Sequence, residues 1–351
     1  MSRSIFAQKR SRLRTRRIVI VCVTVLLVIS LLAGLFFLFR GKSNPKNDEK
    51  EQTSPTTSAD ASTPPTTPTG DDVLHEEPPT MEPVRELPAD FITRHTESPR
   101  ILLYDISAQT VLYSKNGDEL CAPASLTKLM TAIVALEYAY PETEITAGNE
   151  LYLLDPESSR AGIYIGHRMT LKQALQGLLL KSGNDTAYVI AAQVGHMIDE
   201  NVSGQDAIDL FCQKMTEKAK AIGCTNTTFR NPDGIDKEGH MTTANDLLKI
   251  AIHALKQPLL AEIMSTEQVT TTLLSGQSKT WKTSNKLMQT DSKYYYEGVC
   301  GMKTGTTDGA GNCLISLATR DDRTILCIVL GAKTDALRYS ETIELLNLGF
   351  S

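Results

Sequence analysis

Clustered positive charge is missing from most of this 351-residue sequence. Lys and Arg together number 36 against 41 Asp and Glu, and residues 91–351 carry a net charge of −6. Nucleic-acid binding depends on clustered Lys and Arg that contact phosphates, so we exclude this class of function. The composition also lacks the biases of a collagen, a coiled coil or a wholly disordered chain.

Aromatic side chains are absent between Gly41 and Asp90, where nine of the fifteen prolines lie. Thr, Ser, Asp and Glu dominate this stretch, which contains four basic and eleven acidic residues. Such a segment buries too little apolar surface to offset the entropy lost on ordering. We therefore predict a disordered linker over residues 40–92, which reaches about 40 Å if it behaves as a flexible coil.

Charged residues are missing from residues 18–39, a run of 22 residues. A helix of this length spans about 33 Å, the thickness of the hydrocarbon core of a bilayer. Seven basic residues and no acidic residue precede the run, and such an excess keeps the preceding segment in the cytoplasm. The sequence therefore predicts a basic cytoplasmic tail over residues 1–17, one transmembrane helix over residues 18–39 and an extracellular remainder.

A cleaved signal peptide is the alternative reading of the same run. Its apolar stretch is usually about 7 to 15 residues long and ends in a small-x-small site. Leu31 and Leu32 stand two places before Ala33 and Gly34, so neither pair forms such a site. We favour an uncleaved anchor in the cell membrane.

Histidines with metal-ligand spacing are also absent. The six histidines show no such pattern, so we predict no metal and no other cofactor, and we interpret His240 as a packing or hydrogen-bonding group. Six cysteines follow the apolar run, an even number that suggests disulfides in an oxidising compartment. However, Cys212 and Cys224 are separated by about 18 Å along a predicted helix, and Cys313 and Cys327 lie out of register in a predicted hairpin. We therefore predict free thiols.

Strand-like runs occur at the two ends of the region that follows the linker, and helical periodicity lies between them. The predicted strands are Arg100–Asp105, Val111–Lys115, Val299–Gly305, Asn312–Thr319 and Thr324–Gly331. The predicted helices are residues 126–136, 174–180 after a capping box at Thr170 and Gln173, 205–222, 244–255 after Thr243, and 336–348. This order predicts an α/β protein of the α+β type, in which both ends of the domain form an antiparallel five-stranded sheet with flanking helices.

Ser125 and Lys128 stand three residues apart, on one face of a predicted helix. A serine beside a base is a nucleophile that can be activated, although such a pair is common by chance and recurs as Ser43 and Lys46 in the linker. Two further motifs change this assessment. Ser182-Gly-Asn184 and Lys303-Thr-Gly305 follow at intervals of 57 and 121 residues, and the three elements in this order are a signature of penicillin-binding proteins and class A β-lactamases.

The sequence closely resembles the serine D-alanyl-D-alanine carboxypeptidases, the low-molecular-mass penicillin-binding proteins of the peptidase S11 family. The likeness covers about residues 95–350 and includes longer matching stretches. These are residues 122–131, 178–185, 231–236 with Gly239-His240, 301–307 and 346–350. The resemblance implies a catalytic domain over residues 93–351 with a penicillin-binding protein and β-lactamase-like fold, in which a helical subdomain flanks the sheet and the active site lies between them.

The resemblance also implies a role for each motif residue. Ser125 would attack the carbonyl of the penultimate D-alanine of a peptidoglycan stem peptide, and Lys128 would accept its proton. Burial and a second cation, Lys303, would lower the pKa of Lys128. Ser182 would pass a proton to the leaving amine, and Asn184 would hold Lys128 and the substrate. The groups that would bind the terminal carboxylate are Lys303, Thr304, Gly305, Thr306 and Arg338. The backbone N–H groups of Ser125 and Thr306 would form an oxyanion hole, worth about 3 to 4 kcal/mol per donor.

The expected partners are stem peptides that end in D-Ala-D-Ala, β-lactam antibiotics as inhibitors, and the lipid bilayer through residues 18–39. Two alternatives stay open: a β-lactamase on the same scaffold, and a non-catalytic protein that binds cell-wall peptides. Asp233 departs from the family, because many relatives have His there. Ser158-Ser159 matches a family serine pair near the cleft or forms a loop cap. The N-terminal helix would replace the C-terminal membrane helix of many relatives.

Overall fold

Both ends of the described chain meet in one antiparallel sheet. The computed structural model describes residues 96–351, so the predicted cytoplasmic tail, transmembrane helix and linker lie outside the described residues. The strands follow the order β2-β1-β9-β8-β7, and all neighbours are antiparallel. Their bounds are β1 Arg100–Asp105, β2 Thr110–Lys115, β7 Val299–Thr307, β8 Gly311–Arg320 and β9 Arg323–Ala332. All five strands were predicted, and Leu102 of β1 pairs with Ile328 of β9.

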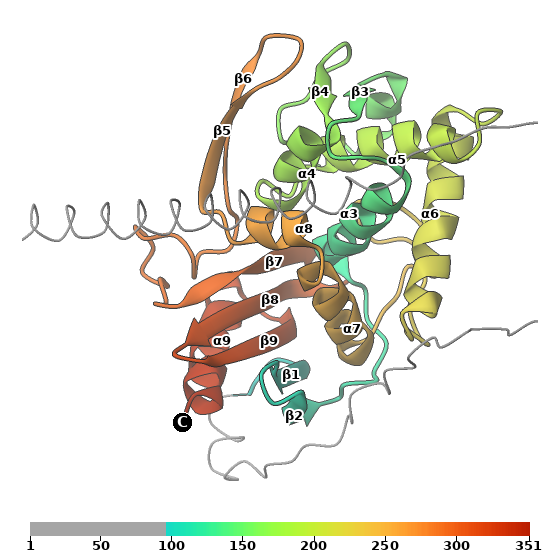
Figure 1. Ribbon diagram of the computed structural model, residues 1–351. Helices are drawn as coiled ribbons and strands as arrows, with labels where there is room; N and C mark the ends of the chain where they lie inside the picture. The colour runs from blue at the N-terminus through green and yellow to red at the C-terminus, as the bar shows by residue number, and fades with distance from the viewer. Residues whose placement is uncertain (1–95) are drawn as a thin grey trace, which may run out of the picture. The chain divides into compact units, whose positions relative to one another are not determined.

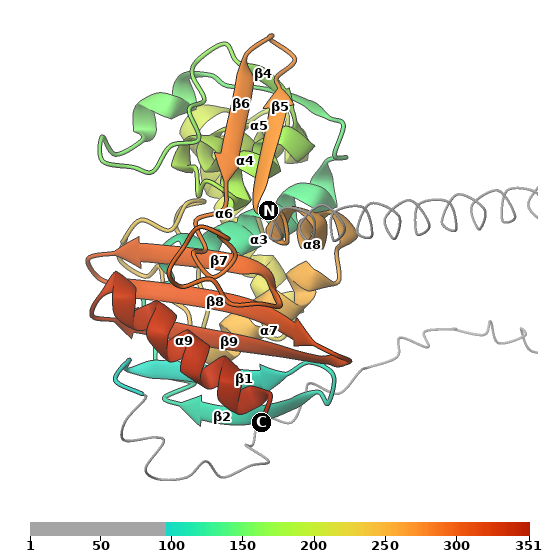
Figure 2. The same cartoon turned by 90° about the vertical axis from the view of Figure 1, so that its left-hand side faces the viewer.

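The sheet is covered on both faces, because the alternating side chains of its central strands are apolar on both sides. One face packs against the last helix, α9 (Asp335–Gly349), which was predicted and lies diagonally across the strands in Figure 2. The residues of this layer include Ile101, Leu103, Ile325, Cys327, Val329, Leu345 and Leu346. The opposite face belongs to the larger core under the remaining helices and includes Leu102, Leu326, Ile328 and Leu330.

The helical part surrounds one buried helix. Its elements are η1 (Ala124–Leu126), α3 (Thr127–Tyr138), η2 (Asn149–Leu153), α4 (Leu171–Leu179), α5 (Asn184–Ile198), α6 (Gly204–Ala221), α7 (Ala244–Leu255) and α8 (Pro258–Met264). Helix α3 contacts α4, α5, α6 and α7 (Figure 1). Every residue from Thr127 to Ala135 is buried. A helix surrounded in this way is expected to be apolar on all sides. The lysine at position 128 is the charged exception.

The helix starts predicted at Thr170 and Thr243 are confirmed by the hydrogen bonds that cap them. The Thr170 hydroxyl accepts a hydrogen bond of 3.2 Å from the Gln173 backbone N–H, and the Gln173 side chain accepts one of 3.1 Å from the Thr170 N–H. The Thr243 hydroxyl accepts a hydrogen bond of 3.1 Å from the Asp246 N–H at the start of α7. These contacts satisfy N–H groups that have no partner within their own helix.

The prediction that the middle of the chain is helical is wrong for two small two-stranded sheets, of which the second is a hairpin. One joins β3 (Glu144–Thr146) to β4 (Arg168–Thr170), and the other joins β5 (Gln268–Thr272) to β6 (Ser278–Lys282). The second hairpin is fixed by tertiary contacts: the buried Trp281 donates a hydrogen bond of 2.8 Å to the Ala161 carbonyl. Short strands with this kind of anchor carry a weak sequence signal.

Two further sequence predictions concern membrane segments and thiols. Within residues 96–351, no helix combines the length and the apolar character needed to cross a bilayer. The six cysteines of this part of the chain are free thiols. Cys327 lies opposite Ser316 in the β8–β9 pair, and Cys313 packs in the larger core on the other face of the sheet.

We expect Asp185→Asn to lower the free energy of unfolding by about 2 to 3 kcal/mol. The Asp185 carboxylate is fully buried and accepts hydrogen bonds from the N–H groups of Ala161 (2.8 Å), Gly162 (2.9 Å) and Ile163 (2.9 Å). An amide cannot accept them all, because its NH₂ group is a donor. Urea denaturation measures the change. The exposed Glu200→Gln is the matched control, and an equal loss in both variants would contradict the prediction.

Candidate active site

Ser125 and Lys128 lie at the junction of η1 and α3, and their side chains are in contact. The Lys128 amine is 2.8 Å from the Ser125 hydroxyl oxygen. It is also 2.8 Å from the Asn184 side-chain oxygen and 2.6 Å from the Asp233 carbonyl. Lys128 is fully buried, whereas Ser125 is partly exposed. A nucleophile that faces solvent is thus paired with a base that does not.

Burial lowers the pKa of Lys128 to about 8, and the nearby carboxylates of Asp233 and Asp185 oppose this shift. The charged form of an amine is the one that burial disfavours. A minority of molecules then holds a neutral Lys128 at pH 7, and only the neutral amine can accept a proton from Ser125. The pair therefore has the geometry and the protonation balance of a serine activated by an amine.

Lys303 of β7 supplies the second buried amine. It donates hydrogen bonds to the Ser182 hydroxyl (2.8 Å) and to the Thr304 carbonyl (2.9 Å). Its pKa is lowered well below its ordinary value by burial, and further by the charges of Lys128 and Arg338. We expected Lys303 to lower the pKa of Lys128. The repulsion between the two ammonium groups is mutual and adds to the effect of burial, while the carboxylates of Asp233 and Asp185 oppose the lowering of the pKa at Lys128.

The Ser182-Gly-Asn184 segment links α4 to α5 in a constrained turn. Ser182 has a φ of 60°, in the left-handed region that non-glycine residues rarely adopt. A Cβ on Gly183 would lie 2.6 Å from a carboxylate oxygen of Asp185 and 2.7 Å from the Ala161 Cβ. The turn therefore requires glycine, and it directs the flanking Ser182 and Asn184 to Lys303 and Lys128, respectively.

Strand β7 passes directly beside the nucleophile. A Cβ on Gly305 would lie 2.9 Å from the Ala124 Cβ and 3.0 Å from the Ser125 backbone nitrogen. Only a glycine lets the strand approach this closely. The backbone on either side of Gly305 is thereby held next to Ser125, which is the arrangement that the predicted oxyanion hole of the Ser125 and Thr306 N–H groups requires.

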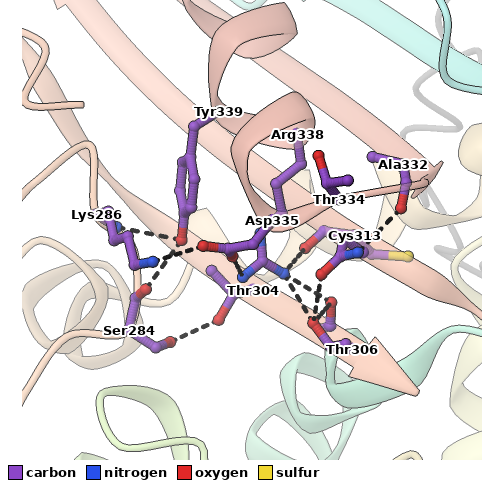
Figure 3. Close-up of polar contacts among 12 residues, drawn as sticks. Ser284, Lys286, Thr304, Thr306, Cys313, Ala332, Thr334, Asp335, Arg338 and Tyr339 are labelled. Carbon is purple, nitrogen blue, oxygen red and sulfur yellow. Dashed lines mark hydrogen bonds and ion pairs between the residues drawn. The ribbon is translucent and has the colours of Figure 1, made fainter. Parts of the chain in front are cut away.

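Arg338 of α9 lies behind the end of β7 (Figure 3). One terminal nitrogen donates to the Gly305 carbonyl (3.0 Å), the Thr306 hydroxyl (2.9 Å) and the Cys313 carbonyl (3.3 Å). The other pairs with Asp335, whose second oxygen is 2.5 Å from the Lys286 amine. Arg338 is 7% exposed. Arg338 therefore holds the Thr306 side chain in place without itself lining the cleft.

The predicted residues fall into two groups around a cleft of about 520 Å³. A cleft of this volume suits a small ligand. Ser125, Ser182, Thr304, Gly305 and Thr306 line it. The remaining predicted site residues lie behind these: Lys128, Asn184, Lys303 and Arg338. The sequence reasoning missed other lining residues, which are Lys181, Lys282, Thr283, Ser284, Lys286 and Gln289.

No motif marks most of the missed residues, because they lie in irregular chain between β6 and β7, whereas Lys181 directly precedes the Ser182 motif. Their signal is structural: the Ser284 and Thr304 hydroxyl oxygens are 2.6 Å apart, which joins this segment to β7. Of the predicted serine pair, Ser159 lines the cleft. The buried Ser158 hydroxyl has no hydrogen-bond partner among the described residues.

His240 is a structural residue, as predicted. It is 1% exposed, and its Nδ1 accepts a hydrogen bond of 2.9 Å from the Arg230 N–H. Its Nε2 therefore carries the proton and lies 2.8 Å from the Thr127 hydroxyl. Burial lowers the pKa of His240 to about 4. The ring is neutral at ordinary pH and ties the residue before Lys128 to the 230–240 loop.

A serine hydroxyl beside one buried amine, with a second amine on an adjacent sheet strand, defines the class of serine acyl-transfer enzymes with a Lys base. The comparisons agree. The family model described as D-alanyl-D-alanine carboxypeptidase, peptidase S11, matches residues 89–334. The chain belongs to this family.

Individual relatives support the assignment. The chain is 31% identical over 259 residues to D-alanyl-D-alanine carboxypeptidase DacF of Bacillus subtilis, covering 73% of this chain and 62% of that protein. It is 32% identical over 254 residues to the D-alanyl-D-alanine carboxypeptidase of Streptomyces sp. strain K15, covering 69% of this chain and 83% of that protein. The crystal structure of the Streptomyces K15 DD-transpeptidase has a TM-score of 0.66 at 30% identity, and the match covers 72% of this chain and 97% of that chain.

The pKa of Lys128 predicts how the reactivity of Ser125 depends on pH. Because only the neutral amine accepts the proton, the rate of Ser125 acylation by a β-lactam should rise about tenfold per pH unit and level off above about pH 8. Stopped-flow acylation between pH 5.5 and about 9.5 measures this. Lys128→Arg, which stays charged, should be slow at every pH. A flat profile in the wild type would contradict the assignment of the base.

Proposed function

We propose that the protein is a serine-type D-Ala-D-Ala carboxypeptidase that removes the terminal D-alanine from peptidoglycan stem peptides. The observation that carries this proposal is the 2.8 Å contact between the Ser125 hydroxyl and the fully buried Lys128 amine. Membership of the D-alanyl-D-alanine carboxypeptidase family supports the substrate class. The chain covers 62% of the length of DacF and 65% of DacC of Escherichia coli, so the activity of the whole protein is a proposal.

The reaction begins with proton transfer from Ser125 to neutral Lys128 as the hydroxyl oxygen attacks the carbonyl of the penultimate D-alanine. The N–H groups of Ser125 and Thr306 stabilise the negative oxygen of the tetrahedral intermediate. The C–N bond then breaks, and Ser182, in contact with Lys303, relays the proton that Lys128 took from Ser125 to the leaving amine, so Lys128 is neutral again. Free D-alanine departs and an ester on Ser125 remains.

Hydrolysis of the ester completes the cycle. Neutral Lys128 accepts a proton from a water molecule that attacks the ester carbonyl, and it returns this proton to the Ser125 oxygen as the ester bond breaks. The same nucleophile opens a β-lactam ring by attack on its amide carbonyl. In this case the amine stays attached to the acyl group, so the leaving group does not depart and the adduct persists.

The terminal carboxylate of the substrate binds at the β7 side of the cleft. Thr304, Thr306, Ser284 and Lys286 line this side, and Arg338 holds the Thr306 hydroxyl in place from behind. A carboxylate is stabilised by several donors of which at least one is charged. Binding the carboxylate here leaves the rest of the peptide to extend past Ser125 toward the helical side.

Ser125→Ala should abolish release of D-alanine from an acetylated peptide that ends in D-Ala-D-Ala, while its unfolding transition stays within about 1 kcal/mol of the wild type. The loss follows because the nucleophile is removed, and Ser125 is partly exposed. An enzymatic D-alanine assay measures the release. Rapid turnover of labelled penicillin without D-alanine release would instead favour a β-lactamase, and binding without either reaction would favour a non-catalytic receptor.

We also propose that residues 18–39 anchor the chain in the cell membrane, with the catalytic domain on the extracellular face and residues 1–17 in the cytoplasm. The uncharged run, the basic residues before it and the polar linker support this arrangement. External protease on protoplasts should remove a C-terminal epitope and leave an N-terminal epitope protected. A mature protein that has lost its N-terminal epitope would show that the run is a cleaved signal peptide.

A further inference from the structure

The loop of residues 231–236 contacts helix α3 through its backbone. The Asp233 carbonyl accepts the hydrogen bond of 2.6 Å from Lys128, and the Pro232 carbonyl accepts one of 2.6 Å from the Thr131 hydroxyl. Both donors belong to α3. The loop therefore has a fixed position relative to the buried lysine that activates the nucleophile.

The same loop has a fixed shape. The Asn231 side chain spans it, because its oxygen accepts a hydrogen bond of 2.8 Å from the Gly234 N–H and its NH₂ group donates one of 2.7 Å to the Ile235 carbonyl. Gly234 has a φ of 94°, and a Cβ there would lie 1.8 Å from the Ala124 carbonyl oxygen. The loop backbone thus packs directly against the residue that precedes Ser125.

Asp236 connects this loop to the end of β7. One oxygen of its carboxylate accepts a hydrogen bond of 2.6 Å from the Thr307 hydroxyl, and the other accepts one of 2.7 Å from the Gly309 N–H in the turn after β7. The two donors lie 71 and 73 residues further along the chain, so the contact joins two separate segments. Hydrogen bonds to a carboxylate are shorter and stronger than those between neutral groups. One side chain therefore holds the turn against the loop.

Thr306 lies between two anchors of β7. On one side Arg338 donates a hydrogen bond of 2.9 Å to the Thr306 hydroxyl (Figure 3). On the other side Asp236 holds Thr307, the next residue of the strand. If the proposed function holds, the Thr306 N–H binds the negative oxygen that develops when Ser125 attacks. Its effect depends on where it lies, because donors of an oxyanion hole act at about 2.7 to 3.1 Å from that oxygen.

We propose that Asp236 is a positioning residue for the oxyanion hole. Its carboxylate fixes the end of β7 to the same loop that fixes Lys128, so that the Thr306 N–H stays in place relative to Ser125. Asp236 does not line the cleft, and it acts through Thr307 and the turn that follows. This inference rests on the proposed function and extends it to a residue outside the cleft.

The rates of the two chemical steps test this role. Asp236→Ala removes both acceptors, so we expect the rate constant of acylation by a labelled penicillin to fall about tenfold, less than the about hundredfold effect of removing an oxyanion donor outright. Release of the label should slow by a similar factor, because hydrolysis also passes through a negative oxygen. The dissociation constant before acylation should stay within about twofold of the wild type. Asp236→Asn keeps one acceptor and should have intermediate rates.

Two readouts separate this role from a general loss of structure. The pH at which acylation levels off should stay at about 8, because the contacts of Lys128 are unchanged. In a Thr307→Val background, Asp236→Ala should reduce the rate by a smaller factor than in the wild type, because one of its two hydrogen bonds is already absent. Glu238→Gln is the control, since Glu238 is an exposed acid two residues further along the chain, and it should keep the wild-type rates.

Wild-type rate constants in Asp236→Ala would overturn the inference. A change confined to the dissociation constant, or to the free energy of unfolding, would overturn it as well. Both outcomes leave the proposed function intact as long as the wild type releases D-alanine from a peptide that ends in D-Ala-D-Ala. No release by the wild type would overturn the proposed function, and this inference with it.

Discussion

The burial of two lysine side chains beside one another is the constraint on which the rest of the structure depends. Moving an ammonium group out of water costs several kcal/mol unless hydrogen bonds replace its hydration. Lys128 and Lys303 are both fully buried, and their partners come from separate segments. These are η1, the turn before α5, the 231–236 loop and β7. The segments that close the core are therefore the same ones that assemble the site.

The ion pairs at the end of β7 also bring several charged side chains from different segments together. Asp335 is shared by Arg338 and Lys286, so two cations have one counter-ion and a single positive charge is left over. Because Arg338 is engaged with Gly305, Thr306 and Asp335, it shapes the wall of the cleft without forming its surface. An arginine that is buried in this way stabilises the geometry of hydroxyl groups in front of it.

Local patterns in the sequence were sufficient to predict the five strands of the large sheet, two helix caps and the three motifs. The five strands alternate or run apolar, and Thr170 and Thr243 precede their helices in a recognisable way. Ser125 and Lys128 are neighbours because they are three residues apart near a helix start. The contact of Lys128 with Asn184 and that of Lys303 with Ser182 could be predicted only through the family resemblance, since nothing local to these segments fixes such distances.

The parts that escaped prediction depend on tertiary contacts. Hairpin β5–β6 is held by Trp281, which reaches a carbonyl 120 residues earlier in the chain. Ser284 belongs to no motif and becomes part of the cleft only because Thr304 and Leu180 bind it. The position of Arg338 behind Thr306 follows from the packing of α9 on the sheet, which the sequence of either element leaves open.

The pairing of β1 with β9 has a consequence for the order in which the domain can form. Leu102 and Ile328 are opposite one another in the sheet although most of the domain is synthesised between them. A nascent chain that has not reached β9 carries β1 with one edge unpaired, and it lacks the helix α9 that covers the far face. Such late closure favours slow folding and a need to shield the exposed strand during synthesis. The site around Ser125 is therefore complete only after β7, β9 and α9 have been synthesised and the last strand of the sheet has paired with the first.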